Sequence, residues 1–257
     1  MTNYADVHCH LSFPEFDADR DETIVRLKAA GVGIVIDPGT DVASSRRSIE
    51  LAGKHEFIHA NVGLHPGEVR TPFGNELFDE LAHLARSEKV VGIGEIGLDY
   101  HWPDHDPRLQ ADAFREMLRL ACSLDLPVVI HCRDAWPDML RILSEERSSN
   151  LRGAMHCFSG DLEIALKCIG YGLKISIPGT VTYKKSQLPE VVAGLDLGEL
   201  LSETDAPYLS PVPMRGRRNE PAYVVHTVRT IADLRSETIE EVTERLVDNA
   251  RSLFGLP

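Results

Sequence analysis

The feature that most constrains the fold is a regular alternation of short apolar runs with longer amphipathic segments along 257 residues. The apolar runs predict strands at 4–10, 33–37, 58–64, 90–95, 127–131, 153–156, 173–177 and 200–205. The amphipathic segments predict helices near 19–30, 41–54, 75–88, 107–124, 135–147, 161–169 and 185–195, and a longer pair within 220–254. Continuous Val, Ile and Leu runs are typical of parallel strands buried on both faces. Eight of them alternating with helices predict an α/β fold, a (β/α)8 TIM barrel.

A doubly wound open sheet is the main alternative to the barrel, because it uses the same alternation of strands and helices. A chain of this length is typical of one barrel domain, so we expect a single domain over 1–257. Local signals support the boundaries. Asp41 is placed to cap a helix that Gly53 ends, and Pro127 begins a strand.

The composition restricts where the protein acts and what it binds. The formal net charge is −13, with 40 acidic against 27 basic residues. This argues against nucleic-acid binding through a broad basic surface, although bound metal ions can supply positive charge at a local site. Five cysteines without a CxxC pair indicate reduced thiols. With no secretory signal and no membrane-spanning apolar run, we expect a cytoplasmic protein.

Residues of the kind that bind metals fall at the predicted strand ends. They are His8 and His10 on the first strand, Glu95 on the fourth, His131 on the fifth, His156 on the sixth and Asp205 on the eighth. The carboxyl ends of barrel strands converge on one rim, where active sites of this fold lie. A single histidine at a strand end is more often a hydrogen-bonded structural residue than a metal ligand. Six of them at five strand ends indicate a shared metal site.

This donor set predicts two divalent ions. His8 and His10 are two residues apart on a strand and point to the same side. Six protein ligands exceed what one catalytic zinc takes, and two ions that share a carboxylate fit better, with Glu95 as the candidate bridge. Such ions activate water as a nucleophile, and Zn, Mn or Mg are all compatible with imidazoles and carboxylates. Each of Cys9, Cys132 and Cys157 adjoins a predicted ligand, so alternation turns it toward the helices.

Seven motifs, in order along nearly the whole chain, resemble the TatD family of metal-dependent deoxyribonucleases, within the amidohydrolase superfamily. They are DVHCHL at 6–11, GLHP at 63–66, GIGEIGLDY at 92–100, VIHCR at 129–133, HCFSG at 156–160, ETDAPYL at 203–209 and RGRRNEP at 215–221. The resemblance implies that the six residues above are the metal ligands. Glu95 then stands where many relatives use a carboxylated lysine. Asp205 is the first candidate for proton transfer and Glu203 the second, with a salt-bridged strand residue as the alternative for Glu203.

The same resemblance suggests residues that bind substrate phosphate. His65 precedes a proline at a strand end, with a structural hydrogen bond as the alternative role. Arg133 and Arg217 are candidates to clamp phosphate through their forked donors. Four further basic residues add positive field or are solvated surface charges: Lys184, Lys185, Arg215 and Arg218.

The function that this set implies is hydrolysis of DNA phosphodiester bonds by a metal-activated water, of the 3′→5′ exonuclease type. The substrate would be single-stranded DNA or duplex ends, with no membrane association and no obligate protein partner. One alternative is a hydrolase of another ester or amide on the same site, such as an aminoacyl-tRNA deacylase or a lactonase. The other is a barrel without catalytic activity, against which the complete ligand set argues.

Overall fold

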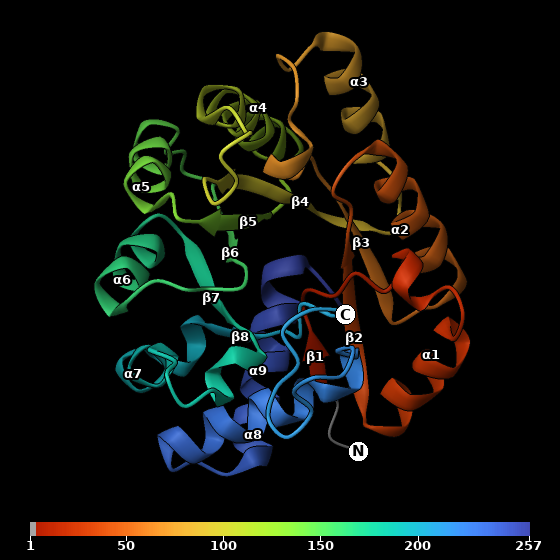
Figure 1. Ribbon diagram of the computed structural model, residues 1–257, viewed down its shortest axis with the longest axis vertical. Helices are drawn as coiled ribbons and strands as arrows, with labels where there is room; N and C mark the ends of the chain where they lie inside the picture. Colours follow the sequence, from red (N-terminus) through yellow and green to blue (C-terminus); the bar gives the residue numbers. More distant parts are fainter. Residues whose placement is uncertain (1–3) are drawn as a thin grey trace.

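The computed structural model describes residues 4–257, and within them eight parallel strands form one sheet in chain order (Figure 1). The strands are β1 (Tyr4–Asp6), β2 (Val32–Pro38), β3 (Ile58–Val62), β4 (Val90–Asp99), β5 (Val128–Arg133), β6 (Gly153–Met155), β7 (Leu173–Ile177) and β8 (Leu200–Ser202). Hydrogen bonds also join β8 to the chain after β1. The Val7 amide donates to the Ser202 carbonyl at 3.1 Å, and Cys9 pairs with Ala206 in a parallel bridge. The predicted barrel is therefore confirmed over the open sheet.

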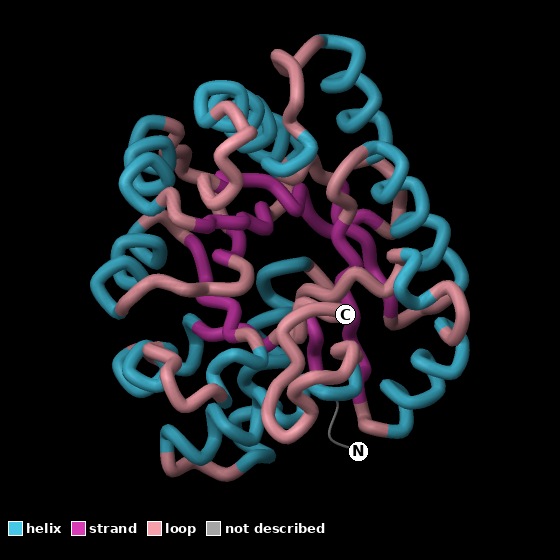
Figure 2. Tube along the Cα trace, viewed as in Figure 1, coloured by secondary structure: helices cyan, strands magenta, loops and turns pink. Residues whose placement is uncertain are grey.

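Helices surround the ring of strands, as Figure 2 shows. They are α1 (Arg20–Ala29), α2 (Val42–Lys54), α3 (Asn75–Leu84), α4 (Pro107–Leu124), α5 (Trp136–Glu145), α6 (Leu162–Gly170), α7 (Leu188–Gly194), α8 (Val224–Arg235) and α9 (Ile239–Phe254). Short 3₁₀ turns lie at Pro14–Phe16, Pro66–Glu68, Gly179–Thr182, Leu197–Glu199 and Pro221–Tyr223. Among the helices formed by residues 4–257, none combines the length and the hydrophobicity that crossing a membrane requires.

Two apolar clusters hold the barrel together. The larger one fills the space between the strands and the surrounding helices. The smaller one joins Ala5, Ile34 and Val129, near the beginnings of their strands, to Val247 and Phe254 of α9. Helix α9 thus packs against the amino ends of the strands. This leaves the carboxyl ends of the strands as the place for polar side chains.

The helix and strand boundaries agree with the prediction in part. Asp41 caps α2 as expected, since its Oδ1 accepts the Ser44 amide at 2.6 Å. The expectation that Gly53 ends this helix is wrong, because the helix continues through Lys54. Strands β1, β6 and β8 end before their metal-type residues, whereas β4 and β5 continue beyond Glu95 and His131.

Candidate metal centre

Glu95 lies at the centre of the predicted ligands and is 3% exposed. Its Oε2 atom is 3.5 Å from His8 Nε2 and 3.6 Å from His10 Nε2. Its Oε1 atom is 2.9 Å from His131 Nδ1 and 3.2 Å from His156 Nε2. The two oxygens of one carboxylate therefore face two separate pairs of imidazoles, which is the arrangement expected of a carboxylate shared between two sites.

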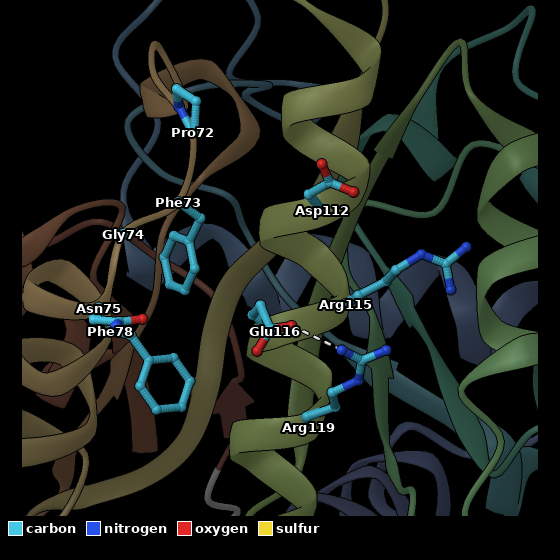
Figure 3. Close-up of a pocket in the computed structure, with 9 residues that line it drawn as sticks. All are labelled: Pro72, Phe73, Gly74, Asn75, Phe78, Asp112, Arg115, Glu116 and Arg119. Atoms are coloured by element: carbon cyan, nitrogen blue, oxygen red, sulfur yellow. Dashed lines mark hydrogen bonds and ion pairs between the residues drawn. The ribbon is translucent and has the colours of Figure 1, made fainter.

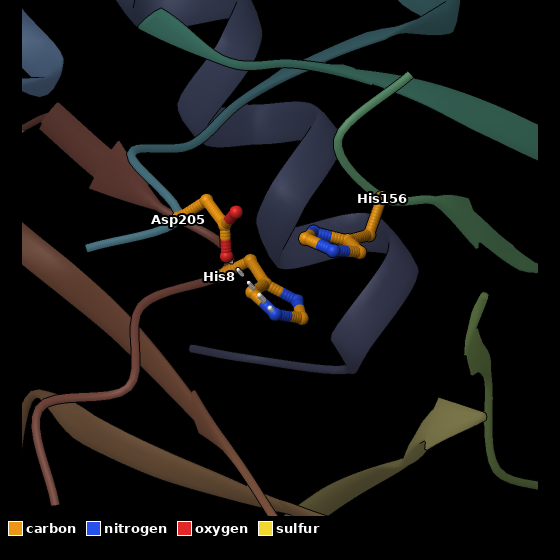
Figure 4. A group of neighbouring side chains, drawn as sticks. All are labelled: His8, His156 and Asp205. Carbon is orange, nitrogen blue, oxygen red and sulfur yellow. Dashed lines mark ion pairs between the residues drawn. The ribbon is translucent and has the colours of Figure 1, made fainter. Parts of the chain in front are cut away.

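Asp205 completes the first of these groups. Its Oδ1 atom is 3.6 Å from His10 Nε2 and 3.9 Å from His8 Nε2. Figure 4 shows one carboxylate oxygen directed at His8 and the other turned away from it. The Asp205 amide donates to the His8 carbonyl at 2.9 Å, so the chains after β8 and β1 hold the two side chains together. The rings of His8 and His156 stack with centroids 3.5 Å apart.

The spacing of these donors fits metal coordination. Ligand atoms within 4.8 Å of one another occur in three overlapping groups: His8–His156–Asp205, His8–His10–Glu95 and His65–Glu95–His131. Ligands about 2.0–2.2 Å from one ion lie roughly 3–3.5 Å apart, and the Nε2 atoms of His8 and His10 are 3.3 Å apart. Imidazole and carboxylate donors suit divalent transition metals. The structure brings all six predicted ligands together.

The electrostatics of the cluster differ from one member to the next, because burial opposes a charge on His10, His131 and His156 but nearby carboxylates outweigh it and raise their pKa. Burial opposes a charge on Glu95, but the surrounding histidines His65, His156 and His131 outweigh it and lower its pKa well below the usual value. Burial and the neighbouring His156 lower the pKa of His8 to about 3. His8 is therefore neutral at physiological pH, and the neutral imidazole is the form that binds metals.

Two further carboxylates contact imidazoles of the predicted ligands. Glu203 is fully buried, and its Oε1 accepts hydrogen bonds from His156 Nδ1 at 3.1 Å and from the Cys157 amide at 2.7 Å. Asp99 Oδ2 lies 3.3 Å from His131 Nε2. Carboxylates in this position fix the ring orientation and the basicity of a ligand histidine. Sequence reasoning missed Asp99. Asp99 and Glu95 are separated by an even number of residues on β4, so both side chains lie on the same face of the strand. This spacing is the signal that could have predicted Asp99.

A cavity of about 920 Å³ lies above the cluster at the carboxyl ends of the strands. The predicted ligands that line it are His10, Glu95, His131, His156 and Asp205. Two of the three predicted phosphate-binding residues, His65 and Arg133, also line it. Arg217 is exposed and is not among the residues that form the cavity wall. The wall includes four aromatic residues that the sequence analysis did not single out: Phe13, Trp102, Phe158 and Tyr208.

His65 is held in one tautomer. Its Nδ1 atom accepts the Gly67 amide at 3.0 Å, so the ring proton of the neutral imidazole lies on Nε2. Burial lowers the pKa of His65 to about 4, which keeps the ring neutral. The Nε2 atom lies 3.5 Å from Glu95 Oε1, at the edge of the ligand cluster. His65 is therefore a hydrogen-bond donor at the floor of the cavity.

The remaining basic candidates differ in their surroundings. Arg218 pairs with Asp19 at 2.7 Å and with Glu220 at 3.3 Å. Arg215 packs over the ring of Tyr183 at 4.2 Å. Lys184 and Lys185 are exposed.

The cysteines follow the expected alternation only in part. Cys9 is fully buried in the larger apolar cluster, between the strands and the helices, as expected. Cys132 belongs to that cluster but also reaches the cavity wall. Cys157 lines the cavity because it follows the end of β6 with a φ of 45°, where strand alternation no longer applies. Burial, reinforced by Asp205 and other carboxylates nearby, raises the pKa of the Cys157 thiol well above its usual value.

A second cavity of about 680 Å³ lies outside the barrel, between the segment that leads into α3 and the face of α4 (Figure 3). Phe73 and Phe78 form one side, and Arg115 and Arg119 line the other. Both arginines are already paired with Glu146, at 3.0 and 2.7 Å. The described residues that line this cavity include no histidine or cysteine. Its described lining therefore offers two carboxylates, Asp112 and Glu116, but none of the imidazoles that line the first cavity.

Known proteins resemble this chain over nearly its whole length. Residues 5–255 match the family model described as TatD related DNase. The metal-dependent hydrolase YabD of Bacillus subtilis is 40% identical over 252 residues, which cover 98% of each chain. The protein named 3′-5′ ssDNA/RNA exonuclease TatD of Erwinia amylovora is 35% identical, over 98% of this chain and 99% of its own. The crystal structure of the TatD homologue YjjV from Escherichia coli superposes with a TM-score of 0.93 at 34% identity, covering 99% and 98% of the two chains.

Proposed function

This chain is a metal-dependent hydrolase of the TatD family, and on that premise we propose that it is an exonuclease that removes nucleotides from the 3′ ends of DNA single strands. The observation that carries the proposal is Glu95, whose two oxygens face separate imidazole pairs at the floor of an open cavity. The cavity also holds a neutral donor, His65, and a forked cation, Arg133. The Erwinia amylovora relative, named for a nuclease activity, supports the substrate class at 35% identity.

The proposed cofactor is a pair of divalent cations, Zn, Mn or Mg. The residues that would hold one are His8, His10 and Asp205 with Glu95 Oε2, and those that would hold the other are His131 and His156 with Glu95 Oε1. When bound, such ions supply positive charge for the phosphate and activate water for attack. The donor set fits because each group combines imidazoles with a carboxylate oxygen of Glu95.

The chain's own residues divide the remaining work. Asp205 accepts the proton of the attacking water, whose oxygen bonds to phosphorus as the bond from phosphorus to the 3′ oxygen breaks. The same proton then passes to that 3′ oxygen, so the shortened strand keeps a 3′ hydroxyl and the released nucleotide carries a 5′ phosphate. His65 Nε2 donates to a non-bridging oxygen. Arg133 contacts the next phosphate. Glu203 and Asp99 hold His156 and His131 in place.

The test is digestion of a single-stranded oligonucleotide labelled at its 5′ end by the protein loaded with Mn²⁺, beside a His131→Ala variant. We expect a ladder of products that shorten from the 3′ end, with at least 100-fold slower cleavage by the variant. Equal cleavage, or none, by the two proteins would overturn the nuclease proposal. A parallel assay with a carboxylic ester identifies the alternative hydrolase if the ester is cleaved and DNA is not.

A further inference from the structure

The rim of the cavity carries aromatic side chains that are too exposed to contribute to the core. Trp102 is 50% exposed and Tyr208 is 48% exposed, although both line the cavity. Trp102 follows β4, which lies across the barrel from β8 and β1 in the strand order. Leaving an indole half in water forgoes favourable burial, so its position on a cavity wall suggests a ligand surface.

The indole of Trp102 is also held in place. The His101 ring meets it edge to face, with centroids 4.9 Å apart and an interplanar angle of 85°. The His101 amide donates to Asp99 Oδ1 at 3.0 Å, and His101 Nδ1 lies 3.2 Å from Asp134 Oδ2. Asp99 is the residue whose other oxygen faces the ligand His131. The position of Trp102 is therefore linked through two residues to the metal centre.

The positively charged side chain of Arg133 lies close to the indole of Trp102. The guanidinium of Arg133 lies 5.9 Å from the centre of the Trp102 ring, within the range of a cation–π contact. Arg133 is itself exposed and lines the same cavity. An aromatic face beside a guanidinium, both next to a phosphate-hydrolysing centre, is the combination that binds one nucleotide of a single strand. The ring takes the base and the guanidinium takes the phosphate.

We propose that Trp102 and Arg133 form a subsite for a nucleobase of single-stranded DNA, in which Trp102 stacks on the base while its phosphate contacts Arg133. This inference rests on the proposed nuclease function and adds how the site selects its substrate. A base that stacks on Trp102 is separated from its complementary strand, so the subsite favours unpaired ends over blunt duplex. Stacking of this kind changes binding roughly 5- to 100-fold per base.

Steady-state cleavage of a single-stranded oligonucleotide tests the role of the ring. We expect Trp102→Ala to raise KM at least 5-fold while kcat changes less than 2-fold, and Trp102→Phe to restore most of the loss. The matched control is Leu166→Ala, an equally exposed apolar residue on α6. A second substrate, in which the terminal nucleotides carry tetrahydrofuran in place of the base, should be insensitive to Trp102→Ala. An unchanged KM, or an equal loss on the base-free substrate, would overturn the subsite.

A binding measurement separates failure of the subsite from failure of the proposed function. The chain has two tryptophans, and in a Trp136→Phe background the emission comes from Trp102 alone. Titration with a short thymidine oligonucleotide in the presence of a chelator, where no cleavage occurs, should quench this emission. If DNA is not cleaved but the emission is quenched, the nuclease proposal fails and the nucleobase subsite stands. If the emission is unchanged, the subsite is wrong whether or not the protein cleaves DNA.

Discussion

At the residue scale, the hydrogen bonds of Glu203 distinguish two roles for this carboxylate. The sequence analysis made it the second candidate for proton transfer. In the structure it is fully buried behind His156, and its second oxygen accepts from Ser176 Oγ at 2.6 Å. Because both carboxylate oxygens accept hydrogen bonds from the protein, the placement of Glu203 favours a role in positioning His156 over a role in proton transfer.

Replacing Glu203 with Gln tests this role. Because the variant loses the charge that orients His156 Nδ1, we expect metal affinity to fall roughly 10- to 100-fold. Competition with a coloured chelator measures the affinity. Activity at saturating metal should recover most of the wild-type rate, since the proposed proton acceptor, Asp205, is unchanged. If metal affinity is unchanged and kcat alone collapses, Glu203 is a proton carrier instead. Glu163→Gln, at an exposed position on α6, is the control.

Gly63 shows how closely the backbone must approach Glu95. A Cβ atom at this position would overlap the backbone of Gly94 and lie 2.6 Å from the Glu95 carbonyl oxygen. We expect Gly63→Ala to displace Glu95, to reduce bound metal below half of the wild-type content, and to lower the free energy of unfolding by about 1–3 kcal/mol.

The control for this change is Gly53→Ala, whose Cβ would meet nothing within 4 Å in α2. There the substitution should leave metal content intact and raise the free energy of unfolding by up to about 1 kcal/mol, because alanine favours the helix. Elemental analysis and urea unfolding measure both variants. A Gly63→Ala protein with full metal content would contradict the argument.

At the element scale, an ion-pair cluster fastens the loop after β8 to the start of α1. Asp19 accepts from Arg218 at 2.7 and 2.8 Å and from Arg26 at 2.9 Å. The same two arginines bind Glu220. Hydrogen bonds from Arg218 and then Arg26 lower the pKa of Asp19 well below its usual value. A carboxyl group with a lowered pKa stabilises the fold above its unfolded-state pKa of about 3.9, and this contribution is lost as the pH falls through the folded-state pKa.

We therefore expect Asp19→Asn to lower the free energy of unfolding at pH 7 by on the order of 1 kcal/mol, the value for a partly exposed pair. The difference from wild type should shrink as the pH falls below about 4. Urea unfolding of both proteins at several pH values measures it. Asp104→Asn, at a more exposed carboxylate facing Arg70, serves as the control. A difference that stays constant with pH would show that Asp19 acts without its charge.

The same ion-pair cluster shows which features could not be predicted from the sequence. Local sequence patterns predict the order of strands and helices and the six ligand candidates. This is possible because a short run of residues is enough to indicate a strand and where it ends. The position of Arg217 does not follow from local sequence patterns. It depends on how Arg218, its neighbour, pairs with Asp19 almost two hundred residues earlier. The short length of β1 and the extension of β4 to Asp99 likewise depend on hydrogen bonds between strands distant in sequence.

At the scale of the whole molecule, the ligand cluster joins strands from all around the barrel. Its six residues come from β4, β5 and the segments after β1, β6 and β8. The two proposed cations, held by these residues together, would link parts of the chain that are about 200 residues apart, from His8 to Asp205.

Metal binding should therefore stabilise the fold as a whole. A ligand that binds only the folded state at 100 times its dissociation constant adds about 2.7 kcal/mol, which corresponds to a rise in Tm of roughly 5–10 °C for a chain of this size. We expect Mn²⁺ or Zn²⁺ to produce this rise over the chelator-treated protein in differential scanning calorimetry, and Glu95→Gln to lose most of it. Because Glu95 faces both imidazole pairs, its loss should reduce the shift more than His10→Ala, which affects one pair alone. Equal shifts in the two variants would show that the cations bind elsewhere or that Glu95 is not shared.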